Sequence, residues 1–240
     1  MNTNITLKVS KLCKDYDDIK AVKEACFVAH TGDIIALLGP NGAGKSTLMN
    51  IIAGYLAPTS GNVEVLGKDI VKYPIFAKEN IGFLPEGAPL YDDLSVKRFL
   101  LYMSQIRGLN KDAVLKAGKI ANISDVMKQK IETLSKGYKR RVGFAQSILS
   151  NPPILLLDEP TDGLDPNQKD YMRSLIKNLA KDKTIIISTH LLEEVETVCN
   201  RIILLDKGII KADSNLETIL QNTDCQNIAD AFRLLTKEEN

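Results

Sequence analysis

The chain has 240 residues, with 31 Lys and Arg against 30 Asp and Glu. That length accommodates one large α/β domain, and the balanced charge gives no electrostatic indication of a nucleic-acid partner. The four cysteines form no C-x-x-C pair, so we expect free thiols and no zinc site. No apolar run approaches the roughly 20 residues of a membrane span, so we expect no span, and the N-terminus lacks a signal-peptide pattern.

β structure is predicted for the first part of the chain. Residues 5–12 partly alternate apolar and polar side chains, and residues 25–29 form a second short apolar stretch. The run Ile34–Leu38 is continuously apolar, as in a strand that is covered on both faces. It precedes a glycine-rich loop and a helix-like stretch over 48–55, and the loop reads Gly39-Pro40-Asn41-Gly42-Ala43-Gly44-Lys45-Ser46-Thr47.

This loop predicts a site for a nucleoside triphosphate. Its glycines allow backbone N–H groups to turn inward around an anion, and the helix that follows presents its unpaired N–H groups to the same phosphates. Lys45 is expected to reach the β- and γ-phosphates, and the Ser46 hydroxyl to ligate Mg²⁺. An ordinary glycine-rich turn has no reason to carry Lys-Ser at this position.

Helical periodicity replaces the β pattern from Ser95 to Ser150, after short strands predicted at 62–65 and 81–84. Ser95 is a suitable N-cap for the first of three predicted helices. The third helix follows Leu134-Ser135-Lys136-Gly137-Tyr138, whose serine and glycine form a second N-terminus able to bind an anion.

Three cations, Lys139, Arg140 and Arg141, occupy the first turn of that third helix. Cations at a helix N-terminus oppose the helix dipole. We expect a nearby polyanion to offset this cost; a plain helix cap with a basic surface is the alternative.

The β pattern returns after Pro152-Pro153, with short apolar runs at 154–157, 184–187 and 202–205 that predict buried strands. The first two are separated by a helical stretch at about 170–180, which favours a parallel βαβ unit. Asp206-Lys207-Gly208 predicts a hairpin turn. Ser214-Asn215-Leu216-Glu217 has the spacing of a capping box that opens a helical tail, and the amphipathic segment 227–235 is expected to pack on the core.

Candidate catalytic groups follow two of these strands. Asp158 and Glu159 come directly after the run 154–157, at the carboxyl edge where open α/β sheets bind ligands. Asp158 would hold Mg²⁺, and Glu159 would orient or deprotonate the water that attacks the γ-phosphate. A charged turn that caps the next helix is the alternative. His190 follows the run 184–187 and is expected to contact the γ-phosphate through Nε2, whereas His30 has no such setting.

Together these motifs resemble the nucleotide-binding subunit of an ATP-binding cassette (ABC) transporter over essentially the whole chain. The loop 39–47 is similar to the family's Walker A motif, and Ile154 to Glu159 to Walker B with its catalytic glutamate. Leu134 to Tyr138 is similar to the family signature, Gly163-Leu164-Asp165 to the D-loop, and His190 to the switch histidine. Tyr16 stands where the family places an aromatic ring that stacks on adenine.

The resemblance implies an α/β P-loop NTPase fold with a mostly parallel sheet, an N-terminal antiparallel β subdomain and an inserted helical subdomain. One ABC ATPase domain would span 1–240: the core and β subdomain at about 1–90 and 151–212, the helical subdomain at about 91–150, and the tail at 213–240. ATP and Mg²⁺ would be its cofactors.

The resemblance also implies partners. Two cassettes would close head to tail on ATP, so that Ser135 and Gly137 of one, with Asp165, face the nucleotide held by Lys45 of the other. A separate membrane permease would hold the pair at the cytoplasmic face of the membrane and convert closure into transport.

The sequence departs from the usual family pattern at three positions. Glu86 replaces a glutamine expected to coordinate Mg²⁺, and Lys136 and Tyr138 replace glycine and glutamine in the signature. These variants resemble bacterial cassettes of drug export and gliding motility, which favours export over import.

Other classes of function fit the sequence less well. A DNA-repair or ribosome-associated cassette ATPase is the main alternative, but the chain lacks the coiled-coil insertion, zinc modules or tandem cassettes typical of those proteins. The presence of Glu159 and His190 disfavours a cassette that binds ATP without hydrolysing it. A GTPase would need an Asn-Lys-x-Asp motif, which is absent.

Overall fold

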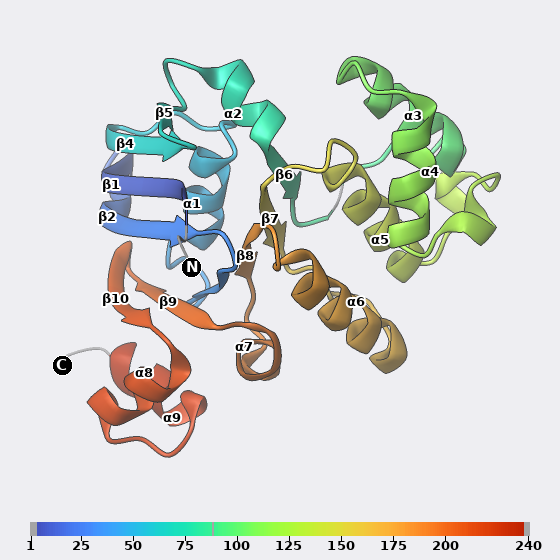
Figure 1. Cartoon of the computed structure of the whole chain (residues 1–240). Helices are drawn as coiled ribbons and strands as arrows, with labels where there is room; N and C mark the ends of the chain where they lie inside the picture. Colours follow the sequence, from blue (N-terminus) through green and yellow to red (C-terminus); the bar gives the residue numbers. More distant parts are fainter. Residues whose placement is uncertain (1–3, 88, 238–240) are drawn as a thin grey trace.

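The computed structural model describes residues 4–87 and 89–237. A four-stranded sheet, in which every pairing is antiparallel, forms the N-terminal part of the fold (Figure 1). Polar and apolar side chains alternate along its strands, so that one face is buried. The strands in spatial order are β2 (Ile19–His30), β1 (Ile5–Tyr16), β4 (Ser60–Val65) and β5 (Lys68–Asp69).

The second sheet has six strands, five of them mutually parallel. Every residue of its three central strands is buried, as the continuous apolar runs predict for strands covered on both faces. The predicted mostly parallel α/β fold is therefore confirmed. The strands in spatial order are β10 (Ile209–Ser214), β9 (Arg201–Asp206), β3 (Ile34–Leu38), β8 (Thr184–Ser188), β7 (Ile154–Asp158) and β6 (Ile81–Leu84), with β10 antiparallel to β9.

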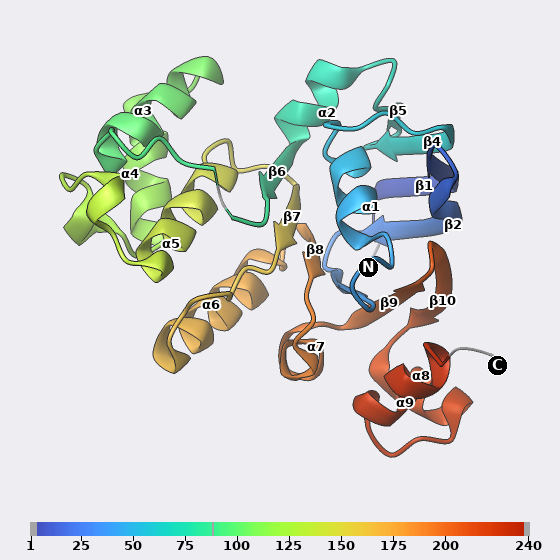
Figure 2. The same cartoon turned by 180° about the vertical axis from the view of Figure 1, so that it is seen from behind.

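Helices lie on both faces of the parallel sheet and to one side of it. α1 (Lys45–Ile52) packs between the two sheets, and Figure 2 shows it in front of β1 and β2. A separate group gathers beyond β6, away from the antiparallel sheet (Figure 1). That group comprises α3 (Val96–Ile106), α4 (Lys111–Ile120), the 3₁₀ turns η1 (Ser124–Val126) and η2 (Ile131–Thr133), and α5 (Lys136–Ser147). The other helices of the core are α2 (Pro74–Asn80), α6 (Pro166–Leu179) and α7 (Leu192–Val198).

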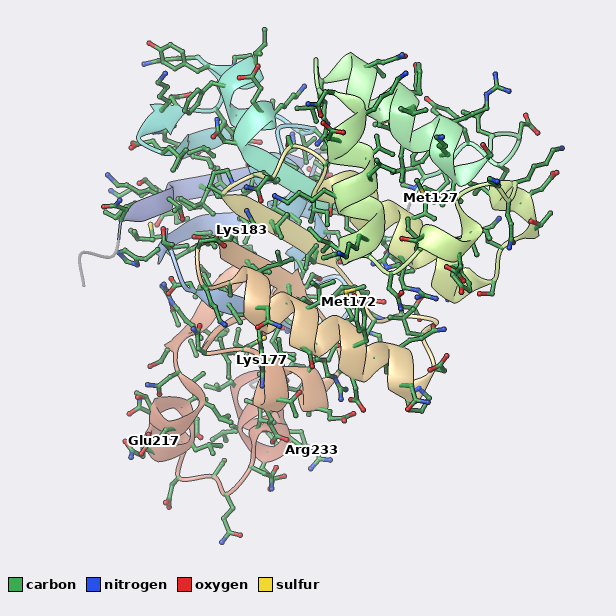
Figure 3. All side chains as sticks on the ribbon, turned by 45° about the vertical axis from the view of Figure 1, so that its right-hand side comes forward. Met127, Met172, Lys177, Lys183, Glu217 and Arg233 are labelled. Carbon is green, nitrogen blue, oxygen red and sulfur yellow. The ribbon has the colours of Figure 1, made fainter. Side chains whose placement is uncertain are left out.

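Strand β7 shows how the two apolar layers are divided. Ile154 and Leu156 pack in the cluster that contains α1 and the antiparallel sheet. Leu155 and Leu157 pack in the cluster that contains α3–α6, among them Met172, which is labelled in Figure 3. Because successive side chains of a strand point to opposite faces, the next residue, Asp158, is directed to the α1 side.

The C-terminal helices α8 (Leu216–Thr223) and α9 (Ile228–Leu235) pack against α7 and the edge of the parallel sheet, as expected for 227–235. The predicted capping box at Ser214 does not form, and the helix has a simple N-cap one residue later. Ser214 is the last residue of β10 and pairs with Ile202, and Asn215 is the N-cap, with its side chain accepting a hydrogen bond from the Thr218 N–H at 2.8 Å. Ser214 therefore pairs with β9 in the sheet and does not cap the helix.

Two other predicted helix starts are confirmed by their caps. Ser95 Oγ accepts from the N–H of Arg98 at 3.3 Å, and Ser135 Oγ accepts from the N–H of Tyr138 at 3.3 Å. α6 begins earlier than expected, at Pro166. In the described part of the chain, no helix has the length and apolar character needed to cross a membrane.

Candidate nucleotide-binding site

The glycine-rich loop joins β3 to α1 at the carboxyl edge of the parallel sheet, and neighbouring backbone confines it. Gly44 precedes the helix with φ of 104°, a left-handed conformation that favours glycine. A Cβ at Gly44 would overlap the carbonyl oxygen of Ala21 in β2, and one at Gly39 would overlap that of Leu205 in β9. Strands of both sheets therefore fix the path of the loop.

Lys45 extends across this loop. Its Nζ donates to the carbonyl oxygens of Gly39 at 2.7 Å and Pro40 at 2.9 Å. Burial lowers the pKa of the ammonium group, and the negative charges of Asp158 and Glu159 act in the opposite direction. Lys45 therefore bonds to the loop and interacts electrostatically with Asp158 and Glu159. Ser46 follows it in the first turn of α1, with an exposed side chain.

The acids gather at the ends of two parallel neighbours, β6 and β7, which pair Leu84 with Leu157. Asp158 is only 6% exposed, and burial raises its pKa. A hydrogen bond with Ser188 opposes that shift, whereas the charges of Glu86 and Glu159 add to it. Glu86, just beyond β6, is exposed. The structure thus brings three predicted acids to one edge of the sheet.

Glu159 has an unusual backbone conformation, with φ of 49°. Its N–H donates to the carbonyl oxygen of Ser188 at 2.8 Å, and its Oε1 lies 2.7 Å from Nδ1 of His190. The contact at Nδ1 leaves Nε2 as the ring nitrogen free to meet a phosphate oxygen. Glu159 and His190, which follow neighbouring strands, form a hydrogen-bonded pair beside the loop.

The segment 134–138 lies apart from this pair. Ser135 caps α5, and Gly137 is buried against the start of α6, where an added Cβ would lie 2.6 Å from Gln168 Oε1. Asp165 caps α6 by accepting from the N–H of Gln168 at 2.9 Å. Within 4–87 and 89–237, no hydrogen bond or ion pair joins Ser135 or Gly137 to the glycine-rich loop.

The ABC transporter family model matches residues 22–162, which is more than half of the chain. The chain belongs to the ABC transporter family. It is similar to the uncharacterized ABC transporter ATP-binding protein MJ1023 of Methanocaldococcus jannaschii, at 37% identity over 97% of this chain and 86% of that protein. The Nod factor export ATP-binding protein I of Rhizobium etli is 35% identical over 83% of this chain and 65% of its own length.

Solved structures agree with this assignment. An ATP-binding subunit of an ABC transporter superposes with a TM-score of 0.89 at 26% identity, covering 97% of this chain and all of that one. A dimeric post-hydrolysis state of the ATP-binding cassette MJ0796, bound to ADP and Pi, superposes with a TM-score of 0.78 at 26% identity, over 88% and 98% of the two chains. The chain is an ABC transporter ATP-binding subunit, and cassettes of this family are ATPases.

Tyr16 ends strand β1 of this cassette and is 44% exposed. The ammonium group of Lys14 lies 5.1 Å from the centre of its ring. One face of the ring is therefore covered by a cation, and the rest is open to a stacking partner.

The expectation for the basic turn of α5 is wrong. Arg140 and Arg141 are each only 6% exposed, and their guanidinium groups donate to carbonyl oxygens of this same chain. Lys139 pairs with Asp92 at 3.0 Å. The two arginines therefore do not form a basic surface, and carbonyl oxygens of this chain surround them in place of the expected polyanion. The positions of these cations in the sequence showed that they oppose the helix dipole. They did not show which distant carbonyl oxygens the arginine side chains reach.

Proposed function

We propose that this ABC transporter subunit hydrolyses ATP to drive export, acting in pairs that close on ATP and reopen after hydrolysis. The proposal depends on the pair of Glu159 and His190, which follow the neighbouring strands β7 and β8 and are hydrogen-bonded at 2.7 Å. A carboxylate in that position can accept the proton of a water that attacks the γ-phosphate. His190 would hold Glu159 and, through Nε2, the phosphate.

The phosphates would lie in the loop 39–47, on the N–H groups at the start of α1. Lys45, now bonded to Gly39 and Pro40, would exchange those carbonyl oxygens for the β- and γ-phosphates. Tyr16 would stack on the adenine ring.

Mg²⁺ fits the donors available here, which are the oxygens of Ser46, Asp158 and Glu86. Burial, and to a smaller extent the charges of Glu86 and Glu159, raises the pKa of Asp158, and a bound cation would favour its charged form. In the described residues, no three His, Cys, Asp or Glu side chains form a ready cation site. The ion would therefore share phosphate oxygens and water, as Mg²⁺ usually does, and would neutralise charge on the phosphates.

Each site would be completed by a second cassette. Ser135 caps α5 at an exposed position outside its own chain's phosphate site. Ser135 and Gly137 of one cassette, with Asp165, would face the nucleotide on Lys45 of the other. The dimeric structures of a similar cassette support this arrangement.

A permease helix would bind an apolar groove of about 580 Å³ between α2 and α3. Tyr55, Ile75 and Ile106 line it and are 73%, 74% and 63% exposed, and exposed apolar surface of this kind is typical of protein interfaces. The permease would hold the cassette at the cytoplasmic face of the membrane. Export is favoured because the similar proteins include ones named for Nod factor export and linearmycin resistance.

Glu159→Gln tests the assignment of the base. We expect unchanged ATP affinity, a loss of kcat of about a hundredfold or more, and an ATP-dependent dimer seen by light scattering. Hydrolysis at the wild-type rate would refute the assignment.

Copurification of the tagged chain with a membrane-spanning protein, from detergent extracts of the source cells, tests the partner. Ile75→Glu should abolish copurification, whereas Leu115→Glu, a matched change at a 62% exposed site on α4, should not. If Ile75→Glu and the wild type are retained equally, the groove is not the permease site.

A further inference from the structure

Arg140 lies in the first turn of α5, but its guanidinium group reaches out of the helical group to the ends of β6 and β7. Nη1 donates to the carbonyl oxygen of Pro85 at 2.8 Å. Nη2 donates to the carbonyl oxygen of Glu159 at 2.7 Å and to that of Asp158. One side chain therefore binds the backbone that precedes Glu86 and the backbone of both Asp158 and Glu159.

This guanidinium group is buried without a carboxylate bonded to it. Within the described ranges, no ion pair includes Arg140, and its buried Nε has no hydrogen-bond partner. Burying a cation costs several kcal/mol, so such a group persists only where its surroundings compensate. Four carboxylates, Glu86, Asp158, Glu159 and Asp162, supply that compensation through their charges. Arg140 is thus the counter-cation of the acidic edge.

Arg140 also helps to hold the strained backbone of Glu159. Its φ of 49° is uncommon for a residue with a side chain, and such strain costs about 1–3 kcal/mol unless neighbours impose it. The Glu159 carbonyl accepts from Arg140 at 2.7 Å and from the N–H of Asp162 at 3.1 Å. The direction of the Glu159 side chain therefore depends on where α5 holds Arg140.

A second link joins the same two segments. Nζ of Lys136, the first residue of α5, lies 2.8 Å from Oδ2 of Asp162. The stem of Lys136 also covers Gly163, where an added Cβ would lie 2.6 Å from Lys136 Cδ. Two cations therefore connect the start of α5, next to Ser135, to residues 158–163: the buried Arg140 and the exposed Lys136.

We propose that Arg140 is a positioning residue for hydrolysis, which transmits the position of Ser135 at the start of α5 to Glu159 of the same chain. The inference rests on the proposed pairing of cassettes. When Ser135 binds the nucleotide of the second cassette, α5 becomes fixed, and Arg140 fixes the main chain of Glu159 beside the nucleotide of its own cassette. Occupation of one site thereby promotes hydrolysis at the other, and ATP hydrolysis is cooperative.

The test compares Arg140→Gln with Arg141→Gln. Arg141 is a matched control because it lies in the same turn, is equally buried, and donates to Asn122 within the helical group at 2.8 Å. We expect Arg140→Gln to lower kcat at least tenfold, to leave the ATP dissociation constant within threefold, and to reduce the Hill coefficient to about 1. Arg141→Gln should keep kcat within threefold and the cooperativity of the wild type. Equal losses of kcat in the two variants would overturn the proposal.

Amide hydrogen exchange supplies a readout that does not depend on hydrolysis. Arg140→Gln should speed exchange over residues 159–164, and Arg141→Gln should not. If Arg140→Gln fails to fold, Lys136→Ala removes an exposed link and should speed exchange at Asp162 and lower the Hill coefficient. Unchanged exchange over 159–164 in the variant that folds would refute the coupling. A wild-type chain that neither hydrolyses ATP nor pairs would refute the proposed function, whereas the exchange result would still decide whether Arg140 holds Glu159.

Discussion

Gly44→Ala tests whether the antiparallel sheet fixes the phosphate loop. The left-handed backbone at Gly44 costs an alanine about 1–2 kcal/mol. The added Cβ would also overlap the carbonyl oxygen of Ala21, which belongs to a paired strand and cannot move by a side-chain rotation. Overpacking of this kind costs about 1–3 kcal/mol. We therefore expect a loss of about 2–5 kcal/mol in the free energy of unfolding.

Gly67→Ala is the matched control. Gly67 also has a positive φ, 75°, but an added Cβ there would meet no atom within 4 Å. It should lose only the backbone contribution, about 1–2 kcal/mol. Urea denaturation measures both variants, and equilibrium ATP binding should show a loss of at least tenfold for Gly44→Ala and less than twofold for Gly67→Ala. If both variants lose equal stability and bind ATP equally well, β2 does not confine the loop.

Three further predictions concern single side chains. Lys45→Ala should lose ATP affinity because it removes the ammonium group from the loop, and unchanged equilibrium binding would contradict the phosphate site. Tyr16→Ala should weaken ATP binding by about 1–3 kcal/mol, the usual worth of stacking between a base and an aromatic ring, and an unaltered dissociation constant would remove Tyr16 from the site. Burial raises the pKa of Cys199 to about 12, so its thiol stays protonated and unreactive at pH 8, while exposed Cys26 should be alkylated; peptide mass spectrometry after iodoacetamide treatment measures both.

The central strands were predictable from the sequence because all of their residues are buried, so none of their positions favours an exposed polar side chain. β3, β7 and β8 are covered on both faces, so each reads as a continuous apolar run whatever its neighbours are. The same runs place Asp158, Glu159 and His190 at strand ends, and parallel pairing of β7 with β8 then brings Glu159 and His190 together. Their roles in hydrolysis remain predictions.

The order of the strands was not predictable from local patterns. β6 pairs with β7 although the whole helical group lies between them in the chain. Which strands become neighbours depends on how distant segments pack, and apolar runs of similar length do not encode that choice. The position of Glu86 beside Asp158 follows from this pairing and from nothing near residue 86 in the sequence.

Arg140 shows why rules about neighbouring residues failed at α5. Those rules compare a cation with the dipole of its own helix, but a long side chain can carry its charge to another element. Lys45 and Arg140 both have their pKa lowered by burial, and the charges of Asp158 and Glu159 oppose that shift in both. Asp158 and Glu159 therefore interact with one cation at the end of the phosphate loop, Lys45, and with another from α5, Arg140. When nucleotide is bound, its phosphates would attract Lys45, and Arg140 would then be the buried cation of the protein that balances the charges of Asp158 and Glu159. Removal of Arg140 should therefore affect Glu159 most when nucleotide is bound.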